Sequence, residues 1–290
     1  MPPDRPSLGD WLKSLPLYVL PHHAISRLTF AATRLRTPLK DPVVRWFIRR
    51  YGVNMDEALS ADLRDYASFN DFFTRALKPG VRSIAEGPGC IASPADSTVS
   101  QLGPITEGRI VQAKGRDYSV YELLGGSKSR AAPFMDGQFI TLYLSPRDYH
   151  RVHMPLDGTL RETVYVPGRL FSVAPHTTRT IPKLFARNER LACLFDTELG
   201  PMALILVGAI NVGAIETTWA GLVTPPAGRQ VRVTPYDETH PLRLKRGQEM
   251  GRFNLGSTVI LLFGEKALSW EARLRTGEPV RMGEALAQRK

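Results

Sequence analysis

The chain has 290 residues, of which 43% are hydrophobic, and a formal net charge of +10. This composition excludes an intrinsically disordered chain and predicts one large domain or a domain with an appendage. The positive charge predicts an anionic partner, either nucleic acid, an acidic substrate or anionic lipid. The cysteines Cys90 and Cys193 are too few for a disulfide framework, which indicates a reducing compartment.

Neither a signal peptide nor a transmembrane span is expected. Residues 1–4 lack the basic and then apolar pattern of a signal peptide. The longest uncharged run, 199–215, is slightly too short for a spanning helix and contains glycine and proline. We predict instead that residues 202–209 and 210–220 form two buried strands of one sheet.

The N-terminal residues are basic and amphipathic. Residues 1–50 contain nine Lys/Arg against three Asp/Glu, and prolines divide 10–52 into short helices. The segment 43–50 combines apolar residues with three arginines. Two interpretations stay open, a helix packed on the body with a solvated basic face, or a helix docked on an anionic membrane surface. Nucleic acid is not an expected partner, because no nucleic-acid-reading module is present.

The pattern changes after Gly80. Residues 56–77 have helix-compatible spacing, and Lys78-Pro79-Gly80 predicts the end of this helix. Ser119 and Glu122 form a capping box for one further short helix. The sequence therefore predicts a helical part, 1–80, and a β-rich part, 81–290. The predicted β-type runs are 90–101, 107–113, 137–144, 158–166, 169–174, 190–196, 202–220, 229–234 and 258–263.

A candidate nucleophile lies near the C-terminus. Gly256-Ser257 predicts a tight turn that leads into an apolar strand. Glycine permits a twisted or strained peptide, and a hydroxyl just after it can attack its own backbone carbonyl if a base takes its proton. An ordinary β-turn is the simpler interpretation.

Two histidines in the segment 145–155 are candidate proton acceptors. Ser145 and Pro146 predict the start of a short helical turn, in which His150 and His153 would share one face. If the segment is extended, the same spacing places the imidazoles on opposite faces. A metal site is a competing interpretation, although no cysteine lies nearby.

Asp96 is the candidate carboxylate that would orient the base. It ends a short apolar run at a turn, where it could equally cap the turn. The order Asp96, His153, Ser257 is compatible with a triad, although triads occur in several orders. Ser257 lacks the Gly-x-Ser-x-Gly context of an α/β-hydrolase.

The segment Leu255-Gly256-Ser257-Thr258 resembles the LGST cleavage motif of bacterial phosphatidylserine decarboxylase proenzymes. The resemblance covers nearly the whole chain. One departure is Ser97, since the family usually has glycine after the triad aspartate. The other matching segments are 68–75, 145–155, 184–190, 195–198, 200–203, 215–217 and 245–251.

The resemblance implies self-processing. Asp96 would hold His153, His153 would take the proton of Ser257, and the Ser257 hydroxyl would attack the Gly256 carbonyl. Loss of the resulting ester by β-elimination would give a large chain, 1–256, and a small chain, 257–290, from one precursor. The first residue of the small chain would become a covalent pyruvoyl group, which forms a Schiff base with the substrate amine. No pyridoxal phosphate and no metal is implied.

The resemblance also implies the reaction, the partners and the fold. Phosphatidylserine would be converted to phosphatidylethanolamine and CO2, with His150 as proton donor or carboxylate positioner. The enzyme would be peripheral, on the anionic cytoplasmic face of the cell membrane, and a homodimer is left open. The expected fold is α+β, with helices packed on a sandwich-like or barrel-like body. Two alternatives are a serine hydrolase that uses an intact Ser257 and a non-catalytic membrane-binding β-domain.

Overall fold

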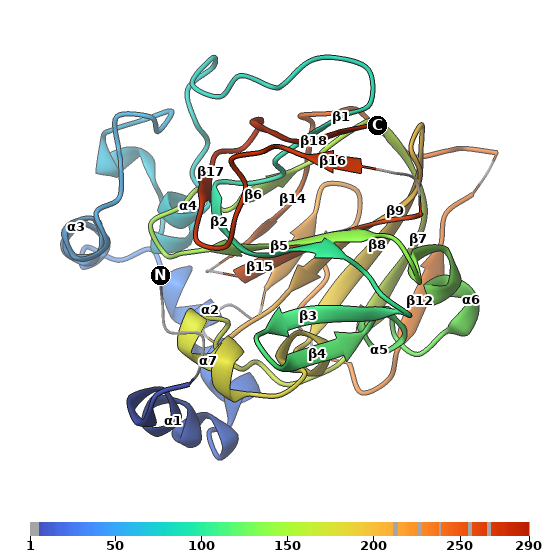
Figure 1. Cartoon of the computed structure of the whole chain (residues 1–290). Helices are drawn as coiled ribbons and strands as arrows, with labels where there is room; N and C mark the ends of the chain where they lie inside the picture. The colour runs from blue at the N-terminus through green and yellow to red at the C-terminus, as the bar shows by residue number, and fades with distance from the viewer. Residues whose placement is uncertain are drawn as a thin grey trace.

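The computed structural model describes residues 6–210, 214–225, 228–237, 239–254, 257–265 and 268–289. These residues form an α+β structure in which antiparallel sheets dominate and the N-terminal helices lie at one side (Figure 1). The predicted fold class is confirmed. The described sheets are open, and none of their strand orders closes into a barrel.

The largest sheet contains nine of the described strands, with β15 between β9 and β5. Every residue of β15 is buried, and a strand covered on both faces has a continuous apolar sequence. The apolar run at 258–263 therefore predicts this strand correctly. The strand order is β12 (Arg232–Pro235), β7 (Gly158–Val166), β8 (Arg190–Thr197), β9 (Gly200–Val207), β15 (Ser257–Phe263), β5 (Gln138–Leu144), β2 (Ser97–Pro104) and β17 (Pro279–Val280), and β13 (Arg243–Leu244) also pairs with β7.

A smaller sheet leads directly into the central strand of the large one. Its order is β11 (Gly221–Leu222), β10 (Ile215–Thr217), β14 (Glu249–Phe253) and β6 (Arg151–His153). Because β14 ends at Phe253 and β15 begins at Ser257, the predicted cleavage segment connects the two sheets. The other described strands are β1 (Cys90–Ala92), β18 (Ala285–Arg289) and β16 (Leu268–Trp270) in one sheet, and β3 (Arg109–Ala113) and β4 (Arg116–Ser119) in a hairpin.

The helices are short, and capping residues in the sequence explain where α1 begins and where α3 ends. Ser7 and Asp10 form a capping box at α1, and Gly52 ends α3 with a φ of 68°. Asp10 also pairs with Arg179 of α7 at 3.1 Å, which holds α1 against the body. The helices are α1 (Leu8–Ser14), η1 (Leu15–Tyr18), α2 (His22–Thr33), α3 (Lys40–Tyr51), η2 (Leu63–Asp65), α4 (Phe69–Phe73), α5 (Val120–Leu123), α6 (Lys128–Ala131), η3 (Ala132–Phe134), α7 (Pro175–Thr180) and α8 (Leu184–Arg187).

The predicted helix over 56–77 is wrong in most of its length. Only η2 and α4 form there, because the segment folds back on itself. The Leu59 N–H donates to the Ala76 carbonyl at 2.8 Å, and the Lys78 N–H donates to the Glu57 carbonyl at 2.9 Å. Ser68 then caps α4 as a new helix. The domain boundary near residue 80 stays a prediction.

Two strand predictions are also wrong. Segments 202–209 and 210–220 do not share a sheet, since β9 belongs to the large sheet and β10 to the smaller one, and residues 211–213 lie outside the described residues. Segment 169–174 forms no strand; Arg169 makes one isolated bridge to Asn188, and the Leu170 N–H donates to the His22 imidazole. By contrast, the predictions for β5, β7 and β8 are confirmed.

Candidate active site

Ser257 is the first residue of the central strand. It lies opposite Leu144 of β5 and is fully buried. Its hydroxyl makes no hydrogen bond with the described residues. A buried hydroxyl without a partner is unfavourable, and such groups occur at functional sites. The other predicted member of the scissile bond, Gly256, lies outside the described residues.

His150 is a buried imidazole close to the end of β14. Its carbonyl accepts a hydrogen bond from the Phe253 N–H at 3.0 Å, and its ring lies 4.1 Å from that of Phe73, centroid to centroid. Its Nδ1 is 2.8 Å from the Asp148 carbonyl, which accepts and therefore fixes the proton on Nδ1. Burial lowers the pKa of His150 to about 3. The imidazole is therefore uncharged at neutral pH, and its unprotonated Nε2 has no partner among the described residues.

His153 ends β6 and lies opposite Glu249 of β14. Its Nδ1 is 2.8 Å from the Gly247 carbonyl, so Nδ1 carries the proton, and the Tyr149 hydroxyl donates to Nε2 at 3.0 Å. Burial lowers the pKa of His153, which favours the neutral imidazole. This side chain therefore has the tautomer and the charge of a general base.

The two histidines do not share a helical face. The Asp148 N–H donates to the Ser145 carbonyl at 3.0 Å, and the Asp148 carboxylate accepts from the Ser145 N–H at 2.7 Å, so a tight turn takes the place of the predicted helix. The chain is extended from Arg151 to His153. The open alternative of an extended segment is therefore the correct one, and the imidazoles occupy different surroundings.

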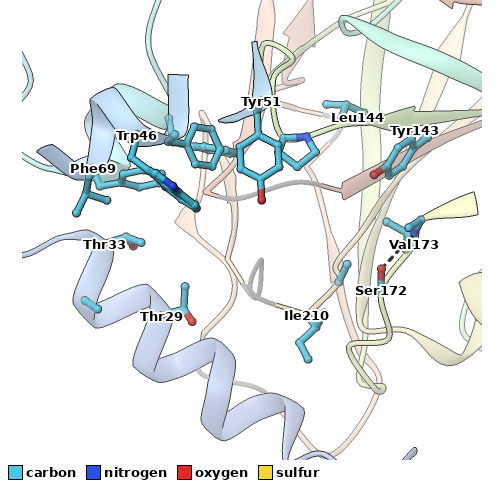
Figure 2. Close-up of a pocket in the computed structure, with 17 residues that line it drawn as sticks. Thr29, Thr33, Trp46, Tyr51, Phe69, Tyr143, Leu144, Ser172, Val173 and Ile210 are labelled. Carbon is cyan, nitrogen blue, oxygen red and sulfur yellow. Dashed lines mark hydrogen bonds between the residues drawn. The ribbon is translucent and has the colours of Figure 1, made fainter. Parts of the chain in front are cut away.

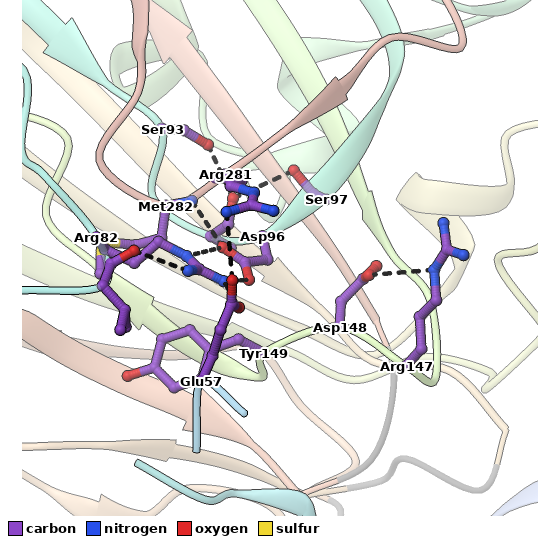
Figure 3. A network of polar contacts seen from close by, with 12 residues as sticks. Glu57, Arg82, Ser93, Asp96, Ser97, Arg147, Asp148, Tyr149, Arg281 and Met282 are labelled. Atoms are coloured by element: carbon purple, nitrogen blue, oxygen red, sulfur yellow. Dashed lines mark hydrogen bonds and ion pairs between the residues drawn. The ribbon is translucent and has the colours of Figure 1, made fainter. Parts of the chain in front are cut away.

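Asp96 lies in a network of charged groups (Figure 3). Arg82 donates to both carboxylate oxygens, at 3.0 and 2.6 Å, and the Met282 N–H donates to Oδ1 at 2.8 Å. Arg82 also donates to Glu57 at 2.6 Å, and Arg281 donates to Glu57 at 3.3 Å. The network joins the region before the sheets to the C-terminal segment. Sequence reasoning missed it, because these residues are far apart in the chain.

The structure brings only parts of the predicted triad together. The backbone N–H of His153 donates to the Pro94 carbonyl at 2.8 Å, so the turn that carries Asp96 and β6 are neighbours. Among the described contacts, no hydrogen bond joins the Asp96 carboxylate to His153 or His153 to the Ser257 hydroxyl. By strand register, His150 is nearer than His153 to the start of β15. The triad stays a prediction.

An apolar cavity of about 600 Å³ is lined by residues that neighbour Ser257 and His150 (Figure 2). It lies between α2, α3 and α4 on one side and the sheet with its connecting loops on the other. Leu144, which pairs with Ser257, lines it, and so does Phe73, which contacts His150. No sequence signal pointed to this cavity, since its walls come from separate segments. Other lining residues are Thr29, Thr33, Val43, Trp46, Tyr51, Phe69, Tyr143, Val173 and Ile210.

The surface around the N-terminal helices is unusually apolar. Most of the exposed large hydrophobic side chains among the described residues belong to the first 51 residues, including Leu8, Leu12, Leu15, Leu28, Leu35, Leu39 and Trp46.

No helix in the described ranges has both the length and the hydropathy needed to cross a bilayer. Cys90 and Cys193 are free and buried. Across the described chain, no three His, Cys, Asp or Glu side chains gather in an arrangement that could hold a metal ion.

A buried serine, a buried imidazole and a partly buried imidazole, in an α+β structure with an apolar cavity close by, are features of an enzyme active site. The sequence model of the family described as phosphatidylserine decarboxylase matches residues 69–288, and another, described as PSD, matches residues 12–52. The chain therefore belongs to the phosphatidylserine decarboxylase family.

Curated relatives agree with this assignment. A protein of Pseudomonas entomophila (strain L48) is 60% identical over 273 residues, which cover 93% of this chain and 95% of the relative. A protein of Pseudomonas aeruginosa (strain LESB58) is 60% identical over 284 residues, which cover 97% of this chain and 98% of the relative. Both are named phosphatidylserine decarboxylase proenzyme. The resemblance seen in the sequence is confirmed.

Proposed function

We propose that the chain is a self-cleaving, pyruvoyl-dependent enzyme that converts phosphatidylserine to phosphatidylethanolamine and CO2. The name of the relatives supports this proposal, because it states the substrate, phosphatidylserine, and calls the protein a proenzyme, which is a precursor. The observation that carries the proposal is the Ser257 hydroxyl, which is buried and without a described partner, on a residue whose strand partner Leu144 lines an apolar cavity.

Self-cleavage begins at the Ser257 hydroxyl. Loss of its proton to a base lets Oγ attack the Gly256 carbonyl carbon, and the bond from that carbon to the Ser257 nitrogen then breaks to give an ester. Removal of the Ser257 Cα proton breaks the Cβ–Oγ bond, which frees the Gly256 carboxylate. Water then replaces the nitrogen of the dehydrated residue, ammonia leaves, and a pyruvoyl group remains at the new N-terminus.

His153 is the proposed base for this cleavage. The Gly247 carbonyl holds the proton on Nδ1 and leaves Nε2 as the basic nitrogen. The negative charges of Glu249 and Asp96 favour the imidazolium that forms when His153 takes a proton. We assign Asp96 to the cleavage on this basis, with Arg82 holding its carboxylate in place.

The pyruvoyl group supplies a carbonyl that condenses with the substrate amine and accepts the electrons released when CO2 leaves. His150 is the proposed acid and base of this second reaction. Because its neutral Nε2 carries no proton, it must first take one from the substrate ammonium group before it can donate one to carbon. Phe73 contacts the His150 ring and also lines the cavity. The imidazole is therefore close to the place where an apolar ligand would bind.

The lipid substrate accounts for the remaining features. The cavity, at about 600 Å³, offers apolar space for part of an acyl chain beside the reacting groups. The exposed apolar side chains and the excess of arginine and lysine in the first 50 residues suit a peripheral location on an anionic membrane, which we propose is the cytoplasmic face. The rest of the acyl chains then stays in the bilayer while the head group reaches Ser257.

The substitution Ser257→Ala tests the proposal. We expect this variant to stay a single chain and to form no phosphatidylethanolamine, because it lacks the hydroxyl that starts the cleavage. Intact-mass spectrometry and a decarboxylation assay measure both outcomes. Ser269→Ala, at an exposed serine of β16, is the matched control and should be cut and active.

The alternatives give other results. A serine hydrolase would stay uncut in the unmodified chain, and a serine-directed phosphonate would label it at Ser257. A non-catalytic β-domain would be uncut, unlabelled and indifferent to Ser257→Ala. Either result would refute the proposed cleavage.

A further inference from the structure

A side chain of the N-terminal region holds the last described residue before the predicted scissile bond. Asn254 is 2% exposed, and its backbone N–H donates to the Ala214 carbonyl at 3.1 Å. Its Oδ1 accepts a hydrogen bond at 3.1 Å from Nδ2 of Asn70, which is buried on α4. Because a buried amide is costly to leave unpaired, this contact fixes the two segments relative to one another.

The residue on the other side of the scissile bond is fixed as well. Ser257 pairs with Leu144 in the central sheet, and the residues that follow it pair with both β5 and β9. Only residues 255 and 256 separate Ser257 from Asn254. An intramolecular attack depends steeply on how its two reacting atoms are held, so the position of Asn254 affects the rate.

The helix that carries Asn70 also contacts the histidine segment. Phe73 of α4 lies against the His150 ring, at 4.1 Å between centroids. The Arg151 Nε–H donates to the Thr74 carbonyl, just after α4, at 2.9 Å. One short helix therefore contacts both the segment before the scissile bond and the strand that carries the proposed base.

We propose that Asn70 is a positioning residue for self-cleavage. By holding Asn254, it fixes the chain two positions before Gly256, and this restraint favours attack by the Ser257 hydroxyl on the bond that precedes it. This inference rests on the cleavage proposed above. It makes cleavage depend on docking of α4, so that a chain whose N-terminal region has not yet packed on the sheets stays uncut.

The test follows cleavage over time after cell-free synthesis of the full chain, with intact mass as the readout. Asn70→Ala and Asn254→Ala should each slow cleavage by about tenfold, the size expected when one hydrogen bond at the reacting segment is lost. The double variant should be no slower than the slower single variant, because both remove the same contact. Asn254→Asp keeps an acceptor for Asn70 and should cleave faster than Asn254→Ala.

A buried amide elsewhere serves as the matched control. Gln112 is 1% exposed, and its Nε2 donates to the Thr178 and Ile181 carbonyls at 2.8 Å each. Gln112→Ala should lower thermal stability at least as much, because the Leu184 N–H also donates to its Oε1 at 2.7 Å, and should leave the cleavage rate of the folded protein unchanged. If Gln112→Ala slows cleavage as much as Asn70→Ala does, the role of Asn70 is structural and the inference is wrong.

Hydroxylamine identifies the step that is affected. It cleaves an accumulated ester, so it should not restore cleavage if Asn70 acts on formation of the ester. Restored cleavage of Asn70→Ala by hydroxylamine would overturn the inference, and so would a wild-type rate in that variant. If the unmodified chain itself stays uncut, the proposed function fails, which is a distinguishable result.

Discussion

At the scale of single residues, the site separates two imidazoles that are only three positions apart. His150 is buried against Phe73 near the start of the central strand, and His153 is bound by the Gly247 carbonyl and the Tyr149 hydroxyl. An extended backbone sends side chains at this spacing in opposite directions. Different surroundings on the two faces allow different roles in cleavage and decarboxylation.

Substitution of each histidine tests this division. We expect His153→Ala to stay uncut, because it lacks the proposed base for the Ser257 proton. His150→Ala should be cut but should decarboxylate at least about a hundredfold more slowly, the contribution typical of a positioned acid or base. Intact mass and product formation measure the two effects separately. An uncut but correctly folded His150→Ala would contradict the division.

The pH dependence of cleavage tests the charge of the base. Burial lowers the pKa of His153, so the imidazole is protonated only when the pH falls below its ordinary range of about 6.5. The charged groups that act on it are Glu249 and Asp96, which favour protonation, and Arg151, which opposes it. The cleavage rate should therefore stay level down to about pH 6.5 and decrease only in more acidic buffer. A decrease centred near pH 6.5 would contradict this prediction.

At the scale of elements, the network around Asp96 connects the two chains that the proposed cleavage would give. Arg82, Glu57 and Asp96 belong to the proposed large chain, whereas Arg281 and the Met282 N–H belong to the small one. The Arg82 side chain is only 6% exposed, so its contacts are shielded from solvent. These contacts, together with the pairing of β15 between β5 and β9, are expected to hold the fragments together after cleavage.

The substitution Arg82→Gln tests how much this network contributes to the free energy of unfolding. Removing one partner leaves the Asp96 and Glu57 carboxylates without their main counter-charge, which we expect to lower the free energy of unfolding by about 3 kcal/mol. Urea unfolding in the uncut Ser257→Ala background measures this loss. Arg273→Gln is the control, because its ion pair with Glu284 is about 40% exposed and should contribute ~1 kcal/mol or less. Equal losses in the two variants would refute the role of the network.

Sequence reasoning succeeded where the pattern is local and failed where distant segments decide the structure. The apolar run of β15 and the capping box of Ser119 with Glu122 both predict what is observed. The helix expected over 56–77 is replaced by backbone hydrogen bonds between the two ends of the segment. Such long-range contacts cannot be predicted from local helix propensity. No local sequence pattern pointed to Asn254, because its proposed role depends on a hydrogen bond from Asn70 of α4.

At the scale of the whole molecule, the N-terminal helices form one wall of the cavity and also expose apolar side chains. This combination suits an enzyme whose substrate is anchored in a bilayer. Leu12 and Leu15 are 61% and 55% exposed, so their proposed role in membrane binding can be tested without unfolding the protein.

We expect the double substitution Leu12→Ser and Leu15→Ser to weaken binding to phosphatidylserine-containing vesicles by about tenfold or more, because two exposed apolar anchors are lost. Vesicle flotation measures the binding. Leu59→Ser is the control, since Leu59 is 59% exposed but lies outside the apolar helices. Unchanged flotation of the double variant would count against membrane docking through this surface.

The most direct test of the account is the mass of the purified, active protein. We predict two chains that correspond to residues 1–256 and 257–290, the smaller with a blocked N-terminus that reacts with carbonyl reagents. A fully active preparation whose 256–257 bond is intact would contradict the account.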